Sequence, residues 1–567
     1  MTPSLSTARR GRRASLPKPR GIAGLISAMA LAVTLAACGG SDSEPVDPTP
    51  QTLVMLRIGG LAPVAGGPVV GAAEIPAYDA DSKRVFLVNG AAATVDVVDL
   101  SDPVNPRRIG SLDLGSTGGA ANSVAIYQGL VAVAVESTPK TNAGSVVFFR
   151  AADLSRLATV TVGALPDMLT FTPDGSRVVV ANEGEPNSYG LPDSVDPEGS
   201  ISIITVNRSG NTVAPSVRTA DFRAFNGQVN ELRAAGVRIY GPGATAAQDL
   251  EPEYITVSED GKTAYVTLQE NNAIATVDID AARVTAIRPL GLKNHNLAGM
   301  GLDPSDEDGG TNTNSGTPVF KIGQWPVQGM YLPDAIASYQ VGGQTYLVTA
   351  NEGDARADWP GFNEEVRIRA HCSNGLDPLV FGADAARLLF DSNLGRLRIT
   401  SAPNGGDTGK NAAGQCTKLW SYGSRSFTIW RASDLSRVYD SGDSLEVITS
   451  GSSFVAFNAS HSDNALDSRS ASKGPEPEGV VIGRFGAKTF AFVGLERVGG
   501  VMVYDITDPA APKHVTYLNP RSGNTGDLGP EGLVLIPAAQ SPNGKPLLIV
   551  GNEQSGTMAV IQINLVF

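Results

Sequence analysis

A short pattern of β-strand signals recurs along most of the chain, and several copies open with a proline followed by an acidic residue. The clearest copy spans residues 474–509, where β-branched runs alternate with turns rich in Gly, Pro and Asp, as in β-hairpins. Related copies begin at Pro166, Pro252, Pro333 and Pro530. Self-similar units of roughly 40–70 residues, each with four short strands, are typical of a β-propeller. We therefore predict an all-β fold, a propeller of four-stranded blades.

The repeat favours one closed array over several domains, because each sheet buries its face only against its neighbours. We expect seven blades if the two units on either side of the insertion at 355–420 share strands, and eight otherwise. Residues 53–61 read as a strand with no nearby hairpin partner. We predict that this strand pairs with the last sheet, residues 530–565, and so removes an exposed edge.

Two segments interrupt the repeat. Residues 221–240 have helical apolar spacing, with Asp221 as a candidate N-cap, and predict a short helical insertion at about 221–245. Residues 355–420 predict one long loop insertion, which contains Cys372 and Cys416. In an oxidising compartment we expect these two cysteines to form a disulfide, and the absence of CxxC spacing argues against zinc.

The first 37 residues differ from the rest, with six basic residues, no acidic ones and then an apolar stretch that ends before Cys38. They read as a signal peptide whose cleavage site resembles a bacterial lipobox, with Cys38 as the lipidated residue. Residues 38–50 read as a flexible tether and 51–567 as the propeller. We expect a lipid-anchored protein of the bacterial envelope, at the outer membrane because Gly39 follows the cysteine.

The formal net charge of −13 would become −19 once the six basic residues of the leader are removed. An acidic surface disfavours nucleic acid as a partner and favours cations or basic ligands. No second stretch is apolar enough to cross a membrane, so we expect membrane contact through the lipid anchor alone.

Acidic residues recur at two points of the repeat. Because antiparallel strands alternate in direction, the start of the first strand and the end of the second lie at the same end of a sheet. We call the acids at the first point the first-strand acids: Asp167, Glu253, Asp334, Glu478 and Glu531. The second-strand acids are Glu183, Glu270, Glu352, Glu496 and Glu553, and Asp354 follows in one of the same loops. Radial repetition predicts that both sets gather around one mouth of the propeller, the first-strand acids nearest the axis.

Clustered carboxylates repel each other and raise each other's pKa unless cations compensate them. Hard oxygen ligands suit Ca²⁺, or Mg²⁺, better than zinc. Arg356 and Arg497 lie close to these acids in the sequence and are candidates for pairing with them or for binding a phosphate or carboxylate. The alternative is that the acids cap turns and pair with arginines.

Residues 303–310 suggest a second calcium loop through Asp303, Asp306 and Asp308, although the spacing is not that of an EF-hand. Among the scattered histidines, His461 is the one candidate for a catalytic role. No nucleophile elbow, phosphate-binding loop or zinc-hydrolase motif is present, so catalysis by such a motif is poorly supported.

Several stretches together resemble the choice-of-anchor I family of secreted bacterial propellers. They include ANEGEPNSYGLPDSVDPEGSISII, QDLEPEYITVSEDGKTAYVTLQENNAIATVDI, YLPDAIASYQVGGQTYLVTANEGDAR and KGPEPEGVVIGRFGAKTFAFVGLERVGGVMVYDITDP. The resemblance covers most of residues 75–567 and implies a propeller. Members are described variously as surface glycoprotein-like or as atypical alkaline phosphatases, so the resemblance implies the fold more firmly than an activity.

Two functions fit these observations. The first is an envelope module that binds Ca²⁺ and an unknown glycan, protein or small-molecule ligand through the acidic mouth. The second is a Ca²⁺-dependent phosphoesterase, in which clustered carboxylates hold cations that activate water and an arginine stabilises the developing charge. Whether the protein is an enzyme stays open at this point, because metal and water chemistry needs no nucleophile motif.

Overall fold

The computed structural model describes residues 48–115, 118–210, 212–310 and 316–567. The chain divides into two units, Met1–Val46 and Asp47–Phe567, and the second unit contains all the described residues. The expected signal peptide, Cys38 and most of the tether lie outside the described residues. Within the described ranges, no helix has the length and hydropathy needed to cross a membrane.

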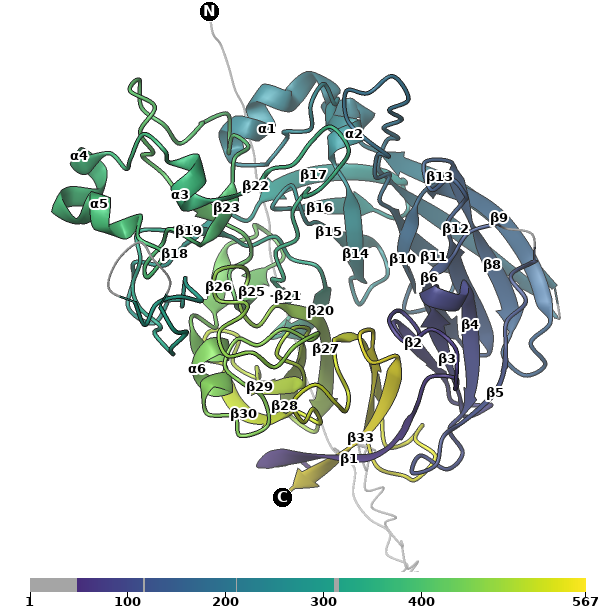
Figure 1. The fold of residues 1–567 in the computed structure, drawn as a ribbon. Helices are drawn as coiled ribbons and strands as arrows, with labels where there is room; N and C mark the ends of the chain where they lie inside the picture. The colour runs from purple at the N-terminus through teal and green to yellow at the C-terminus, as the bar shows by residue number, and fades with distance from the viewer. Residues whose placement is uncertain (1–47, 116–117, 211, 311–315) are drawn as a thin grey trace, which may run out of the picture. The chain divides into compact units, whose positions relative to one another are not determined.

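The described residues of the second unit form seven four-stranded antiparallel sheets, whose arrangement is drawn in Figure 1. The first four, with strands in sequence order, are β2 (Pro76–Asp79), β3 (Arg84–Asn89), β4 (Thr94–Asp99), β5 (Arg107–Ser111); β6 (Ala121–Tyr127), β7 (Leu130–Val135), β8 (Ala143–Arg150), β9 (Arg156–Ala164); β10 (Pro166–Phe171), β11 (Arg177–Asn182), β12 (Ser200–Ser209), β13 (Thr212–Asp221); and β14 (Pro252–Val257), β15 (Thr263–Leu268), β16 (Ala273–Asp278), β17 (Arg283–Pro289).

The other three four-stranded sheets follow the same pattern. They are β20 (Ile336–Val341), β21 (Gln344–Ala350), β25 (Phe427–Arg431), β26 (Arg437–Asp440); β27 (Pro477–Phe485), β28 (Lys488–Leu495), β29 (Val501–Asp505), β30 (Lys513–Leu518); and β31 (Pro530–Ile536), β32 (Leu547–Asn552), β33 (Thr557–Val566), β1 (Thr52–Leu61). The units before and after the long insertion thus share one sheet, β20–β21–β25–β26.

The sheets contact each other in a ring through their first strands. Strand β2 contacts β6, β6 contacts β10, and the series continues through β14, β20, β27 and β31 back to β2. The last sheet takes its outer strand from the start of the domain, since β1 pairs antiparallel with β33 from Thr52 opposite Val566 to Leu61 opposite Met558. This confirms the predicted all-β propeller and its closure by the N-terminal strand.

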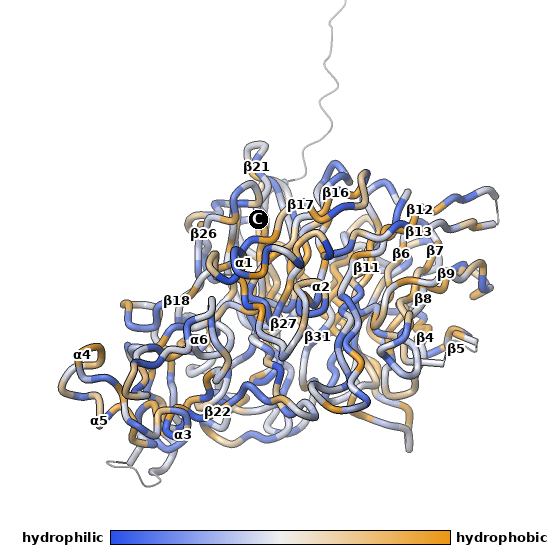
Figure 2. The backbone as a smooth tube through the Cα atoms, turned by 90° about the horizontal axis from the view of Figure 1, so that it is seen from above, coloured by the Kyte–Doolittle hydropathy of each residue, from blue (hydrophilic) through white to orange (hydrophobic). Residues whose placement is uncertain are grey.

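The apolar second strands hold neighbouring sheets together. In β11, Val178 and Val180 pack on one face, in the core shared with β6–β9, while Val179 and Ala181 pack on the other, in the core shared with β14–β17. A strand buried on both faces needs a continuous apolar run, which explains why the runs show little alternation. In Figure 2 hydrophobic stretches follow the packed strands, and many peripheral loops are hydrophilic.

The predicted helical insertion is present as α1 (Val229–Ala235) and α2 (Ala246–Asp249). Leu232 of α1 is buried against the fourth sheet's core. Thr245 and Gln248 form a capping box on α2, which satisfies the free amides of its first turn. Asp221 ends β13, and its Oδ1 accepts a hydrogen bond at 3.1 Å from the amide of Arg223, the first residue of a 3-10 helix (Arg223–Gln228) that precedes α1; the N-cap position itself is Phe222.

The expected long loop at 355–420 has a structure of its own, which corrects that expectation. It forms part of a five-stranded sheet in the order β18 (Leu292–Asn294), β19 (Gln328–Met330), β24 (Trp420–Ser421), β23 (Arg398–Thr400) and β22 (Glu365–Arg367). Helices α3 (Ile368–His371), α4 (Pro378–Phe381) and α5 (Ala385–Leu388) cover a separate small core, and α6 (Ser444–Ser450) lies further along the chain. Cys372 and Cys416 form a disulfide within that core, with Cα atoms 5.6 Å apart.

Candidate functional site

The first-strand acids reach the centre of the ring because of a local irregularity at the start of four first strands. Strand pairing begins at Pro166, Pro252, Pro477 and Pro530, and in each case the register shifts before the third residue that follows. A bulge of this kind redirects the side chains within it. The residue directly after each proline is an acid, so the same bulge recurs at Asp167, Glu253, Glu478 and Glu531.

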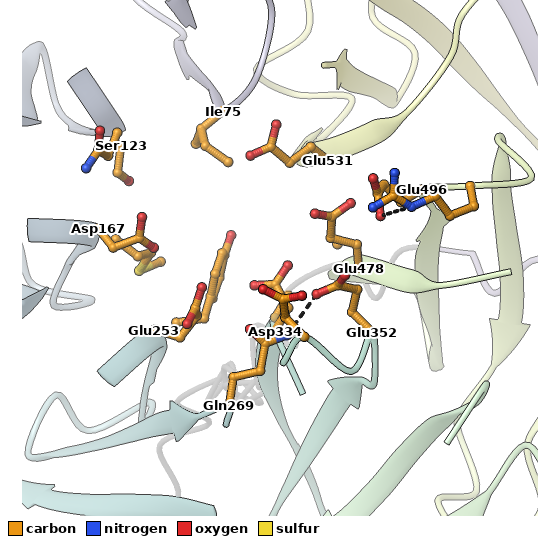
Figure 3. Close-up of a pocket in the computed structure, with 17 residues that line it drawn as sticks. Ile75, Ser123, Asp167, Glu253, Gln269, Asp334, Glu352, Glu478, Glu496 and Glu531 are labelled. Atoms are coloured by element: carbon orange, nitrogen blue, oxygen red, sulfur yellow. Dashed lines mark hydrogen bonds and ion pairs between the residues drawn. The ribbon is translucent and has the colours of Figure 1, made fainter. Parts of the chain in front are cut away.

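The first-strand acids surround one central cavity of about 300 Å³ (Figure 3). Asp334, two residues before the start of β20, lines the same cavity. In the first two sheets Ile75 and Asn122 line the cavity in place of an acid. Each is the neighbour in sequence of the first paired residue of its sheet, Pro76 or Ala121. Figure 3 shows the acids pointing toward a shared space from different sheets. The first-strand acids therefore converge on one shared cavity, as the sequence pattern predicted.

Enclosure and mutual repulsion disfavour the charged form of these acids. Burial and the neighbouring carboxylates Glu185 and Glu136 raise the pKa of Asp167 to about 7. Burial first, and then carboxylates on several sheets, raise the pKa of Glu478, Glu531 and Asp334 well above the usual range. Repulsion acts across the ring, because Asp167 contributes to the shift of Asp334 and of Glu531.

Among the residues that the structure describes, no lysine, arginine or histidine forms an ion pair with a first-strand acid. The Oε2 atoms of Glu478 and Glu531 are buried and accept no hydrogen bond from the described chain. A buried carboxylate oxygen without a donor is costly unless a ligand supplies the missing interaction. The first-strand acids thus form a ring of enclosed carboxyl groups without a basic partner in the described chain.

Two of the second-strand acids also line the cavity, and both have cationic partners. Glu352 lies 2.6 Å from Lys473 and accepts a hydrogen bond from Gln269 at 2.9 Å. Glu496 lies 3.0 Å from Arg497 and 3.1 Å from His461. Asp354 lines the cavity as well, 3.5 Å from Lys473 and largely exposed.

The other second-strand acids do not line the cavity. Gln269 takes the place that the sequence pattern assigned to Glu270, because Leu268 pairs with Pro252 and the next residue faces the ring. Burial raises the pKa of Glu183 well above its usual range, and Asp167, Glu251 and Glu270 are among the carboxylates that add to the shift. Glu553 repels Glu531 without lining the space.

Arg497 forms a basic edge of the cavity, beside His461 and a carboxylate that the sequence pattern missed. Arg497 lines the cavity and lies 3.2 Å from Glu476. Lys473, Arg469 and Arg497 outweigh the burial of Glu476 and hold its pKa far below the usual range. Glu476 stands directly before Pro477, the first residue of this sheet's first strand. The acids on both sides of Pro477 were the sequence signal from which Glu476 could have been identified as part of the site.

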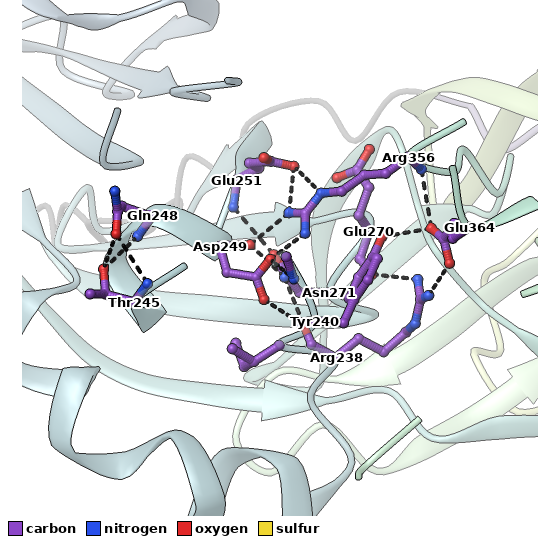
Figure 4. A network of polar contacts seen from close by, with 12 residues as sticks. Arg238, Tyr240, Thr245, Gln248, Asp249, Glu251, Glu270, Asn271, Arg356 and Glu364 are labelled. Carbon is purple, nitrogen blue, oxygen red and sulfur yellow. Dashed lines mark hydrogen bonds and ion pairs between the residues drawn. The ribbon is translucent and has the colours of Figure 1, made fainter. Parts of the chain in front are cut away.

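Arg356 does not line the cavity, and of the two roles expected of it the structure shows ion pairing, with acids other than those of the cavity. It is 3% exposed and bonds to Asp249 and, at 2.7 Å, to Glu251. Tyr240 lies between Arg356 and Arg238, whose guanidinium carbons are 4.6 and 4.1 Å from the ring centre. We call this set, completed by Glu364, the compensated network (Figure 4). It joins the helical insertion to the segment after β21.

Glu74 is a further acid that the repeat pattern did not identify. It stands before Ile75 in the first sheet, where no Pro-acid pair marks the turn. Burial and repulsion by Glu553 and Asp167 raise its pKa to about 8. Glu74 therefore extends the acidic surroundings of the cavity to the first sheet.

The structure brings together a different set of acids from the expected calcium loop at 303–310. Asp306 accepts a hydrogen bond from Nη2 of Arg396 at Oδ2, 2.6 Å away, and does not belong to the cluster of acids. Asp303 and Asp308 are joined instead by Asp467, from a distant part of the chain. The sequence contained no local signal for Asp467, because its placement depends on a long-range contact.

Solved structures with related overall arrangements have little sequence similarity to this chain. Hydrazine synthase of Kuenenia stuttgartiensis is 13% identical, with 88% of this chain and 97% of that chain covered and a TM-score of 0.43. The WD40 domain of Toxoplasma gondii coronin is 9% identical, with 92% and 88% covered and a TM-score of 0.43. The fold assignment rests on the sheets described above.

Two animal proteins are similar in sequence. Gigasin-3a of Magallana gigas is 30% identical over 191 residues, which is 30% of this chain and 66% of that protein. Mesenchyme-specific cell surface glycoprotein of Strongylocentrotus purpuratus is 27% identical over 342 residues, 53% of this chain and 42% of that protein. The chain thus spans just under two thirds of the first relative and less than half of the second.

The model of the choice-of-anchor I domain matches residues 74–509, from the first sheet into the sixth. That range contains four of the five first-strand acids as well as the compensated network. The domain indicates an extracellular or cell-surface protein. The chain belongs to the choice-of-anchor I family.

Proposed function

We propose that this propeller binds a divalent cation, Ca²⁺ in the first place, in its central cavity and uses it to bind a further ligand. The observation that carries the proposal is the ring of first-strand acids, which has no basic partner in the described chain. Carboxylate oxygens are the preferred ligands of Ca²⁺, and Asn122 and Gln269 add amide oxygens to the lining. A cation relieves the repulsion that otherwise opposes ionisation of these side chains.

The spacing of the carboxylates favours an ion that keeps part of its water shell. Among the described residues, no three first-strand acids bring their oxygens within 4.8 Å of one another. A cavity of about 300 Å³ has room for a hydrated cation and a small polar group, since water occupies about 30 Å³ per molecule. Ca²⁺ and Mg²⁺ both accept water beside carboxylates. The open space is what a glycan, peptide or phosphate group would occupy.

A second candidate function, a Ca²⁺-dependent phosphoesterase, is favoured by Arg497. Its guanidinium lines the same cavity as the first-strand acids, beside His461. A bound cation would supply Lewis acidity and lower the pKa of its water. Arg497 would orient a phosphate oxygen, and its pairing with Glu476 would fix the position of the guanidinium.

Calcium binding by the purified chain tests the first proposal, by titration calorimetry after treatment with EGTA. The double variant Glu478→Gln, Glu531→Gln is expected to lose the binding to the cavity while keeping the wild-type circular dichroism spectrum. The matched control is Glu259→Gln, which removes a charge from the exposed β14–β15 turn at the other end of a sheet. Unchanged affinity in the double variant would contradict the proposal.

Hydrolysis of a generic phosphate monoester separates the two candidate functions. Turnover that EGTA abolishes and that Arg497→Gln reduces by at least tenfold would support the phosphoesterase. Calcium binding without turnover would support a binding module. The Arg497 variant keeps the first-strand acids, so its calcium affinity is the internal control.

We also propose that the protein is a lipoprotein held in the bacterial envelope, at the outer membrane, through Cys38. The support is the basic and apolar leader that ends at this cysteine. Expression of Cys38→Ser in a bacterial host is expected to move the protein from the membrane fraction to the soluble one. Retention of the variant in the membrane fraction would contradict the lipid anchor.

A further inference from the structure

We propose that Asp303, Asp308 and Asp467 form a second calcium site, outside the central cavity, which fastens two distant loops of the domain to each other. One loop follows β18 and precedes β19, and the other lies between α6 and β27. The site does not depend on the cation that we propose for the cavity. Its role is structural, because the carboxylates lie in the interior.

The geometry of the three carboxylates is that of a closed oxygen site. One oxygen of each lies within 4.8 Å of the others. Asp303 and Asp467 are fully buried and Asp308 is 5% exposed. Carboxylates this close without solvent repel each other strongly, and a cation with oxygen ligands removes that repulsion.

Unpartnered oxygens point to a missing ligand independently of the clustering. Oδ2 of Asp308 and Oδ2 of Asp467 are buried and accept no hydrogen bond within the described chain. The side-chain oxygen of Asn458 is also buried and unpartnered, while its Nδ2 donates to Ser470, which in turn donates to Asp467. Asn458 is thus joined to the cluster through Ser470, and its own side-chain oxygen lacks a donor.

The remaining oxygens of the three aspartates are held in place by donors. The backbone amide of Lys321 donates to Oδ2 of Asp303 at 2.5 Å. The amide of Val319 donates to Oδ1 of Asp308 at 2.9 Å. These contacts fix the carboxylate planes and leave other oxygens free for a cation, as is usual for ligands oriented by their surroundings.

In the described ranges no basic side chain forms an ion pair with the three aspartates, although the charges of Arg425 and Lys321 partly offset the rise in the pKa of Asp467 and of Asp308. Arg425 lies nearby, but its guanidinium bonds to Glu446 at 2.7 Å and to the backbone oxygens of Asp303, Ser470 and Ser472. Arg396 pairs with Asp306. The cluster contains neither histidine nor cysteine, so hard Ca²⁺ fits it better than zinc.

A cation here would strengthen an existing contact between the two loops. The rings of Phe320 and Phe457 meet edge to face, with centroids 4.8 Å apart. The amide of Asp467 donates to the backbone oxygen of Phe457 at 2.7 Å. Because Lys473 and Glu476 follow in the same loop, the site would also stabilise the basic edge of the central cavity.

Bound calcium per chain, measured by elemental analysis after dialysis in low free calcium, tests this proposal. Asp467→Asn is expected to lose one ion per chain. The matched control Asp306→Asn removes the same charge from the neighbouring position and is expected to lose none, because Asp306 pairs with Arg396. Glu478→Gln with Glu531→Gln should keep this ion even if the cavity binds none, which separates failure of one site from failure of the other.

A local optical signal gives a second readout. The indole nitrogen of Trp325 donates to the carbonyl of Leu302, the neighbour of Asp303, at 3.1 Å. Tb³⁺ bound in place of Ca²⁺ should show indole-sensitised emission that falls severalfold in Trp325→Phe. Asp467→Asn should lose this emission and Asp306→Asn should keep it.

Two results would overturn the proposal: equal calcium content in wild type and Asp467→Asn, or wild-type Tb³⁺ emission that does not depend on Trp325. If Asp467→Asn does not fold, Asp308→Asn replaces it. The comparison of Tb³⁺ emission between wild type and Trp325→Phe remains decisive, because both proteins keep all three aspartates.

Discussion

The central cavity and the compensated network are both rich in enclosed carboxylates, yet they differ in what neutralises them. In the network, Arg356 bonds to Asp249 and Glu251, and Arg238 bonds to Glu364. In the cavity, the first-strand acids meet one another and have no basic partner in the described chain. In the network each of these carboxylates has an arginine partner, although Oε1 of Glu251 accepts no hydrogen bond within the described chain, whereas the first-strand acids have no basic partner there.

This difference has an energetic reason. A buried ion pair repays the cost of desolvation only when both partners remain, so the network acts as a fixed structural joint. A ring of like charges cannot repay that cost internally and instead takes up protons or a cation. The contrast teaches that the number of acids alone does not mark a site, and that their partners do.

The largest effect is expected from breaking the network. Arg356→Met leaves Asp249 and Glu251 without their cation, and we expect a loss of about 3–5 kcal/mol in the free energy of unfolding. Urea denaturation followed by circular dichroism measures it. A loss below about 1 kcal/mol would show that these two carboxylates do not depend on Arg356.

Calcium is expected to have the next largest effect, through the cavity. A cation present at 100 times its dissociation constant stabilises the folded state by about 2.7 kcal/mol. Thermal unfolding with calcium and with EGTA measures the shift, which should vanish for the cavity site in Glu478→Gln, Glu531→Gln. To remove the contribution of the second site, the comparison is made in an Asp467→Asn background.

The cation-free protein should lose stability as the pH rises. Folding raises the pKa of Asp167 to about 7 and of Glu74 to about 8, above ordinary carboxyl values near 4. The folded state therefore binds more protons than the unfolded state between about pH 4 and 8, and the free energy of unfolding falls across that window. Each excess proton contributes a slope of about 1.4 kcal/mol per pH unit.

Denaturation in EGTA at several pH values measures this slope. Glu478→Gln, Glu531→Gln should flatten it, because removing two charges relieves the repulsion on the remaining acids. Stability that rises through this window in the cation-free wild type would contradict the account of an uncompensated ring.

The smallest effect is expected at the surface pair of Asp99 and Arg107, 3.1 Å apart and largely exposed on the arginine side. Arg107→Met should cost less than about 1 kcal/mol, since solvent screens exposed ion pairs. The same denaturation experiment serves as the control for Arg356→Met. A cost equal to that of Arg356→Met would mean that burial does not distinguish the two pairs.

Much of the fold could be predicted because its signals are local. Apolar runs such as Val178–Ala181 are bounded by turns, and they form strands wherever both faces are buried. The Pro-acid pairs could be found for the same reason, since the bulge at Pro477 depends on a few adjacent residues. The N-terminal strand could be assigned to the last sheet from the need to cover an edge.

Other features could not be predicted, because they depend on contacts between remote segments. Strands β22 and β24 are only two or three residues long and are defined by pairing rather than by composition. Gln269 lines the cavity where Glu270 was expected, and this difference of one residue is set by the pairing of Leu268 with Pro252. Arg356 lies close in the sequence to acids of the cavity, and this proximity suggested a role there. Its actual partners, Asp249 and Glu251, lie about 105 residues away in the sequence, so its ion pairs could not be predicted.

The sequence by itself determined that this chain is a closed array of antiparallel sheets with acids repeated at one end of several units, because turn chemistry and apolar runs act over a few residues. Only the tertiary structure decided which of those acids are neutralised. Ion pairing depends on which distant side chains arrive within about 4 Å of each other, and no local pattern encodes that arrival.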